Sequence, residues 1–169
     1  MKELIKTKKQ DITLRFATEE DTPLIFNFIK GLAEYEKLFN EVEATEELLQ
    51  SNLFGERKFV EILIAEYKGE PAGFAIFFHN FSTFVGKQGI YVEDLFVKPE
   101  FRKNGIGKTL LSYITKLAVE RNCGRVEWAV LDWNAPAIQF YRSLGSIPKD
   151  EWTIFRLNRS ALYDLAKEF

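Results

Sequence analysis

The sequence has very few residues of the types that build disulfides and zinc sites. Its 169 residues include one cysteine, Cys123, and one histidine, His79. A single cysteine cannot form a disulfide within the chain, which is typical of proteins from reducing compartments. One histidine and one cysteine also leave little material for a zinc site, so no metal is expected.

Long apolar runs and a marked excess of charge of either sign are also missing. The N-terminal stretch MKELIKTKKQDITLRF is polar and charged, unlike a signal peptide, and no later run reaches membrane-spanning length. The 23 basic and 25 acidic side chains give a net charge of −2, which does not favour nucleic-acid binding. We therefore expect a cytoplasmic enzyme or binding domain without a membrane or nucleic-acid partner.

The remaining composition is that of an ordinary globular protein. Hydrophobic residues make up 46% of the chain and charged residues 28%. This length suits one domain with a sizeable core, and no repeat, low-complexity segment or linker divides it. We expect a single domain over residues 1–169, with residues 1–10 as a flexible or peripheral extension.

Hydrophobic periodicity predicts strands and helices in mixed order. Strands are expected at residues 12–17, 60–67, 73–81, 89–97, 125–132 and 151–158. Helices are expected after the capping residue Asp21 and at 44–54, 105–122, 135–144 and 160–169. Consecutive strands favour antiparallel hairpins, whereas the later strand–helix–strand crossovers need parallel neighbours. The predicted fold class is therefore α/β, with one mixed sheet (α+β).

The stretch RKNGIGKT, at residues 102–109, resembles three phosphate-binding signatures. A P-loop needs glycine five positions before Gly107, and that position is Arg102. The dinucleotide fingerprint G-x-G-x-x-G fails at Leu110, and it belongs in the first β-α-β unit of a mostly parallel fold. The pattern Arg-x-x-Gly-x-Gly fits.

Glycines and a following helix suit this loop to a diphosphate. Without side chains, the backbone N–H groups can approach phosphate oxygens closely, and the helix adds its unpaired N–H groups and positive dipole end. Arg102, Lys103 and Lys108 add positive charge. The alternative is a tight strand-to-helix turn that merely needs glycine.

Two long stretches place this loop in a wider pattern. YVEDLFVKPEFRKNGIG and DWNAPAIQFYRSLG, together with GLAEYEKL and DEW, resemble the GCN5-related N-acetyltransferase (GNAT) family. Within it the chain is most similar to diamine (spermidine/spermine) and thialysine N-acetyltransferases. The resemblance covers nearly the whole chain, and implies the GNAT fold with antiparallel N-terminal strands and a splayed parallel pair.

The resemblance implies that acetyl-CoA binds where the strand at 89–97 diverges from the strand at 125–132. Its pantetheine arm is expected to pair with backbone groups of Leu95, Phe96 and Val97. Its diphosphate is expected at the amides of Arg102, Lys103, Asn104, Gly105, Ile106, Gly107 and Lys108. Further contacts are expected from Asn134, Pro136 and Tyr141.

Acetyl transfer to a primary amine needs a base, because the amine is protonated at neutral pH. An alkylammonium has a pKa near 10.4, so about one molecule in 10³ is uncharged, a penalty of roughly 4–5 kcal/mol. Glu93, acting through a water, is the candidate base. Alternatively, Glu93 is an inward strand carboxylate satisfied by backbone hydrogen bonds.

The departing CoA thiolate needs an acid, and the Tyr141 phenol holds the matching position in the family pattern. Alternatively, Tyr141 is a core aromatic in the helical series with Ile138 and Leu144. The N–H of Leu95 is the expected donor to the oxyanion. No covalent acyl-enzyme is needed, and Cys123 is expected to be a bystander.

The resemblance implies a set of acceptor-binding residues, namely Tyr35, Glu36, Glu93, Asp94, Glu127 and Trp128. Segment 34–47 carries six acidic residues against one basic residue, an imbalance that would attract a polycation. A solvated acidic helix explains these charges equally well. Asp132 and Ala135 replace larger residues common in these relatives, which would resize the acceptor pocket.

We therefore predict an acetyl-CoA-dependent N-acetyltransferase that acts on a diamine or polyamine such as spermidine or spermine. The alternative acceptors are thialysine, another amino acid or a small xenobiotic amine. A non-catalytic acyl-CoA sensor is a further alternative, although the presence of both Glu93 and Tyr141 argues against it. The resemblance also implies a homodimer.

Overall fold

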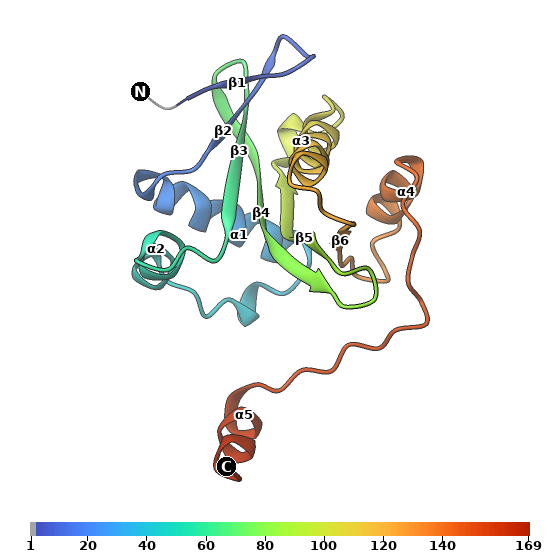
Figure 1. Cartoon of the computed structure of the whole chain (residues 1–169). Helices are drawn as coiled ribbons and strands as arrows, with labels where there is room; N and C mark the ends of the chain where they lie inside the picture. Colours follow the sequence, from blue (N-terminus) through green and yellow to red (C-terminus); the bar gives the residue numbers. More distant parts are fainter. Residues whose placement is uncertain (1–2) are drawn as a thin grey trace. The chain divides into compact units, whose positions relative to one another are not determined.

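A computed structural model describes residues 3–169 and divides the chain into two compact units, Met1–Ala129 and Val130–Phe169. The first unit holds the sheet and three α-helices, and the second holds two α-helices (Figure 1). The expectation of one domain over residues 1–169 stays a prediction. Among the described residues, no helix combines the length and apolar character needed to span a membrane.

The first unit is built on one six-stranded sheet with strands in sequence order. Neighbouring strands are antiparallel except the last pair, which is parallel. The mixed sheet predicted from the sequence is thereby confirmed. The strands are β1 (Ile5–Lys6), β2 (Ile12–Phe16), β3 (Glu61–Tyr67), β4 (Glu70–Ser82), β5 (Lys87–Val97) and β6 (Val126–Trp128).

The helices follow the predicted order, with small shifts at their ends. The first unit contains α1 (Thr22–Tyr35), α2 (Glu46–Phe54) and α3 (Ile106–Glu120), and the second contains α4 (Ala135–Ser143) and α5 (Arg159–Ala166). Three short 3-10 turns, η1 (Glu19–Asp21), η2 (Phe39–Glu41) and η3 (Pro99–Phe101), lie in the first unit. Gly145 follows α4 with φ +87°, a backbone angle that suits glycine at a helix end.

Both faces of the sheet are covered. Consecutive residues of β3 and β4 point to opposite faces, and those in the middle of both strands are buried. On one face Phe28 of α1 stacks on Phe74 of β4, with ring centroids 5.1 Å apart. Leu63 and Ala75 point to the other face and are fully buried. The apolar stripe of α3 is buried as well, and this helix packs against β3, β4 and β5.

The prediction of a strand at 151–158 was wrong. The strand predicted at 125–132 is shorter than expected and consists of β6 alone. Residues 151–158 form neither helix nor strand, and Phe155 is 92% exposed. Alternating apolar residues suit a half-buried strand, but a strand exists only where a neighbour completes its ladder. β6 has such a neighbour over three residues only.

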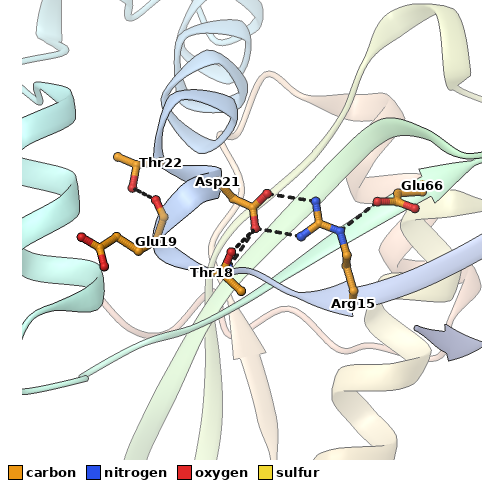
Figure 2. A network of polar contacts seen from close by, with 6 residues as sticks. All are labelled: Arg15, Thr18, Glu19, Asp21, Thr22 and Glu66. Atoms are coloured by element: carbon orange, nitrogen blue, oxygen red, sulfur yellow. Dashed lines mark hydrogen bonds and ion pairs between the residues drawn. The ribbon is translucent and has the colours of Figure 1, made fainter. Parts of the chain in front are cut away.

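A buried ion-pair network joins β2, β3 and the start of α1 (Figure 2). The Arg15 guanidinium donates to both carboxylate oxygens of Asp21, at 2.8 and 3.0 Å, and to Glu66 Oε1 at 2.8 Å. The Asp21 carboxylate also accepts from the Thr18 N–H at 2.8 Å. Asp21 does occupy the N-cap position of α1, but no side-chain capping bond forms there.

We predict that Arg15→Met lowers the free energy of unfolding by about 3–5 kcal/mol, because it leaves the buried carboxylate of Asp21 and the partly buried carboxylate of Glu66 without their cation. Urea unfolding at neutral pH would measure the change. Lys116→Met is the matched control, since it removes an exposed i,i+4 pair with Glu120 and should cost less than about 1 kcal/mol. Equal effects of the two substitutions would contradict a stabilising role for the buried network.

Candidate functional site

A β-bulge in β5 sets the position of the candidate base. In the β4–β5 register, Asp94 pairs with Ile76 and Val92 pairs with Phe77, so Glu93 is the extra residue between them. A bulge bends the strand and redirects the side chains beside it. Glu93 is exposed at this point and Asp94 is only partly exposed.

Beyond the bulge, β5 has one strand partner instead of two. The parallel ladder with β6 joins Ile90–Val92 to Val126–Trp128, and no further pair is described within residues 3–169. On the other edge, pairing with β4 continues to the end of β5 at Val97. The strands therefore separate immediately after Val92, as the family resemblance implies.

The hydrogen-bond pattern shows which backbone groups face the unpaired edge of β5. The Lys98 N–H donates to Ala72 O at 2.9 Å, so the Gly73–Val97 pair is not itself hydrogen-bonded. The N–H and C=O of Val97, and of Leu95 two residues earlier, consequently point away from β4. Those of Phe96 point toward β4. Leu95 and Val97 can therefore bind an extended ligand as another strand would.

The loop between η3 and α3 has the geometry of an anion cradle. Gly105 is the N-cap of α3 with φ +87°, a conformation that favours glycine. The first intrahelical bond runs from the Thr109 N–H to Gly105 O at 3.0 Å. The N–H groups of Ile106, Gly107 and Lys108 consequently have no acceptor within the helix, which fits a diphosphate.

Arg102 connects this loop to α1 and β5. Its Nε donates to Val97 O at 3.0 Å, and its guanidinium carbon lies 4.5 Å from the ring centroid of Tyr35. It also lies 5.9 Å from the ring centroid of Phe96. The backbone of Arg102 therefore belongs to the phosphate loop, whereas its charged side chain lies near the rings of Tyr35 and Phe96.

Three carboxylates gather at the bulge, and we call Glu36, Glu93 and Asp94 the acidic cluster. Burial, followed by the negative charges of Glu93 and Glu36, raises the pKa of Asp94 from 3.8 to about 6. Burial also raises the pKa of Glu36, the residue that ends α1. Because the charges of Glu93 and Glu36 destabilise the ionised form of Asp94, a bound cation would be stabilised here.

Glu127 and Trp128 lie on β6, beside the residues that precede the bulge. Trp128 is in register with Val92 and Glu127 with Tyr91. The Glu127 carboxylate accepts from Asn80 Nδ2 at 2.9 Å and pairs with Arg125 Nε at 2.8 Å. Asn80 is a polar neighbour of the candidate site that the sequence did not indicate, since nothing in its strand pattern marks it.

The remaining predicted residues belong to the second unit. Asn134 is the N-cap of α4, and its buried side chain accepts from the Ala137 N–H at 3.3 Å. Pro136 lies in the first turn of α4. Tyr141 lies farther along the helix, partly buried, with its ring centroid 5.3 Å from that of Phe140. Their roles in binding and catalysis stay predictions.

Comparisons with known proteins agree with this fold and identify the family. The model of the acetyltransferase (GNAT) family matches residues 29–145. The chain is 37% identical to thialysine N-epsilon-acetyltransferase of Bos taurus, over 92% of this chain and 97% of that protein.

Two further similarities extend the comparison. A spermidine/spermine N(1)-acetyltransferase-like protein of Homo sapiens is 30% identical over 96% of this chain and 25% of that protein. Among solved structures, an integron cassette protein from the mobile metagenome of V. cholerae aligns with a TM-score of 0.79 and 27% identity. That alignment covers 94% of this chain and 99% of the other. The predicted family relationship is thereby confirmed.

We predict that Asp94→Asn stabilises the protein at neutral pH. Because the pKa of Asp94 is raised on folding, the native state binds more protons than the unfolded state between about pH 4 and 6, and stability falls as pH rises through that window. Asparagine removes this penalty, so the variant should gain about 1–3 kcal/mol at pH 7.5.

Urea unfolding of the two proteins at pH 7.5 and near pH 3.5 tests the Asp94 prediction. The gain should nearly disappear at the acidic pH, where Asp94 is protonated in both states of the wild type. Glu100→Gln, at an exposed carboxylate on η3, is the control and should show no such gain. A gain that does not change with pH would contradict the assignment to Asp94 ionisation.

Proposed function

The chain belongs to the GNAT acetyltransferase family, whose enzymes transfer acetyl groups from acetyl-CoA to amines, and we propose that its acceptor is an aliphatic diamine or polyamine such as spermidine or spermine. The observation that carries this proposal is the acidic cluster at the bulge of β5. A polyamine keeps positive charge at its other amines after one amine loses a proton. Those remaining charges would bind Glu36 and Asp94.

In this proposal Glu93 is the base. Its exposed carboxylate at the bulge can accept the ammonium proton through a water, while Glu36 and Asp94 supply negative charge beside it. Tyr35, Glu127 and Trp128 complete the acceptor site. The Tyr35 ring packs against Arg102, so it is held in place at the end of α1.

The residues also fit acetyl-CoA, which when bound supplies the acetyl group as a reactive thioester. The amides that begin α3 would hold its phosphates, and the outward-facing Leu95 C=O and Val97 N–H would bind its arm. The Leu95 N–H stabilises negative charge that develops on the acetyl oxygen. As the family resemblance implies, Asn134 and Pro136 would contact the arm, and the Tyr141 phenol would be the acid that protonates the departing sulfur.

Thialysine is the second candidate acceptor, and the 37% identity to a thialysine acetyltransferase favours it. An amino acid differs from a polyamine by its α-carboxylate. That carboxylate would be repelled by the acidic cluster, whereas a polyamine carries no negative charge. The electrostatics of the site therefore favour the polyamine, and the comparison favours the amino acid.

The proposal is tested by incubating the protein with acetyl-CoA and a panel of amines while following release of free CoA thiol. Spermidine, spermine, thialysine, ornithine and propylamine form the panel. We expect the highest kcat/KM with spermidine or spermine, because propylamine has no second ammonium group. Turnover of thialysine with none of spermidine would overturn the polyamine assignment, and no turnover with any amine would overturn the acetyltransferase activity.

We predict that Tyr141→Phe and Glu93→Gln each lower kcat by about 10²–10⁴-fold, the usual contribution of a general acid or base. The dissociation constant for CoA, measured by calorimetry, should change less than about threefold for either variant if each residue acts in proton transfer. Tyr163→Phe, at an exposed tyrosine on α5, is the control and should retain full activity. A large loss of CoA affinity in Tyr141→Phe would show that this residue binds the cofactor.

We also propose that the protein is a cytoplasmic homodimer. Support for the homodimer comes from the exposed apolar side chains of the second unit, which include Trp152, Ile154, Phe155, Leu157 and Leu165. Side chains of this kind gather at interfaces between subunits.

Light scattering should therefore give twice the chain mass of 19.7 kDa. Phe155→Asp should shift the population toward the monomer, because it places a charge among these apolar side chains. Phe84→Asp is the matched control, since Phe84 is 96% exposed in the turn between β4 and β5. A monomeric wild type, or equal effects of the two variants, would contradict the proposal.

A further inference from the structure

We propose that Lys9, in the turn of the N-terminal hairpin, is a further binding residue for the phosphates of CoA. The inference rests on the proposed function and extends its cofactor site to residues 1–10, a segment that the sequence predicts to be flexible or peripheral. It is carried by the position of one ammonium group against the glycine loop.

The β1–β2 turn holds the backbone of Lys9 in a defined place. The Lys9 N–H donates to Thr7 Oγ1 at 3.1 Å, and Lys9 O accepts from the Ile12 N–H at 3.0 Å. Ile12 is itself fully buried at the start of β2. The turn is thus anchored to the core, although Lys9 is exposed.

From this turn the Lys9 side chain reaches the loop that begins α3. Its Nζ donates to Asn104 O at 2.8 Å, across 95 positions of sequence. A Cβ placed on Gly105 would lie 2.3 Å from the same Nζ, so the ammonium lies directly against the glycine. This close approach is possible because residue 105 has no side chain.

The position of the ammonium suits an anion held by the loop. The N–H groups of Ile106, Gly107 and Lys108 have no acceptor within α3, and they follow Gly105 immediately. An ammonium has three N–H groups, and the Asn104 carbonyl accepts from one of them. A fixed positive charge beside free backbone amides strengthens the binding of phosphate, because charge-assisted hydrogen bonds are stronger than neutral ones.

Lys103 and Lys108 also carry charge in the loop, but both side chains are exposed. Lys9 differs from them because it belongs to a separate element of the fold and its ammonium donates a hydrogen bond to a loop carbonyl. The N-terminal hairpin consequently supplies a positive charge at the phosphate site.

The inference is tested by measuring binding without turnover. Titration calorimetry would give dissociation constants of CoA, dephospho-CoA and acetyl-pantetheine for the wild type and for Lys9→Gln, Lys9→Arg and Lys8→Gln. We expect Lys9→Gln to weaken CoA binding by about 5–20-fold. Acetyl-pantetheine, which has no phosphate, should bind to wild type and Lys9→Gln equally. The CoA affinity of Lys9→Gln should also fall less with added salt.

Two variants separate charge from other effects. Lys9→Arg keeps the charge and should restore most of the CoA affinity. Lys8→Gln removes the neighbouring charge of the same turn and should change affinity less than about twofold, because the ammonium that contacts the loop carbonyl is that of Lys9. The dephospho-CoA titration assigns the phosphate: a persisting effect of Lys9→Gln places Lys9 at the diphosphate, and a vanished effect places it at the ribose phosphate.

The possible failures are distinguishable. If the wild type binds CoA and Lys9→Gln binds it equally well, the inference is overturned and the proposed function stands. Equal weakening of CoA and acetyl-pantetheine would also overturn it, since that result indicates a structural role. If the wild type binds none of the three ligands, the proposed function fails together with the inference.

Discussion

The short parallel ladder between β5 and β6 is the constraint on which the candidate site depends. Three residues of each strand pair, and then β5 continues with β4 alone. A fully paired β5 would have its backbone groups occupied by another strand. Because pairing stops at Val92, Leu95 and the Val97 N–H present polar groups that a ligand can satisfy, while the Val97 carbonyl accepts from Arg102 Nε. The bulge at Glu93 lies at the same point, so the candidate base is located where the strands separate.

The same strand also organises the charges of the site. Its bulge carries Glu93 and Asp94 of the acidic cluster, which Glu36 joins from the end of α1, and beyond the strand lies the loop with unpaired amides at the start of α3. A net charge of −2 gives no hint of this local separation. A ligand with anionic phosphates and a ligand with ammonium groups are therefore attracted to different ends of one short segment, which favours binding both in one orientation.

Much of this arrangement could be predicted from the sequence, because it depends on local patterns. The apolar stripe of α3 and the glycine at the start of that helix are visible as spacing in the chain. The bulge at Glu93 was not predictable from alternation, because it is a property of the register between two strands. The absent strand at 151–158 and the short β6 have the same cause: pairing is decided by a neighbour that the segment itself does not encode.

Residues that act through contacts distant in sequence were harder to recognise. The raised pKa of Asp94 comes from burial and from Glu36, which lies 58 positions earlier in the chain. Asn80 reaches Glu127 across the sheet, and Lys9 reaches Asn104 across 95 positions. Asn80 and Lys9 stand in none of the motifs that the sequence offers, so only the folded chain relates these two residues to the site.

Arg102 shows how a motif residue can serve two purposes. The sequence assigns its charge to the phosphate loop, and its backbone does lie in that loop. Its guanidinium, however, lies over the Tyr35 ring, and its Nε occupies the carbonyl of Val97. Tyr35 precedes Glu36, so this one side chain ties the acidic cluster to the loop and to the unpaired edge of β5. The motif arginine thus holds the acceptor and cofactor ends in a fixed relation, which is a reason for arginine at this position beyond the attraction of a phosphate.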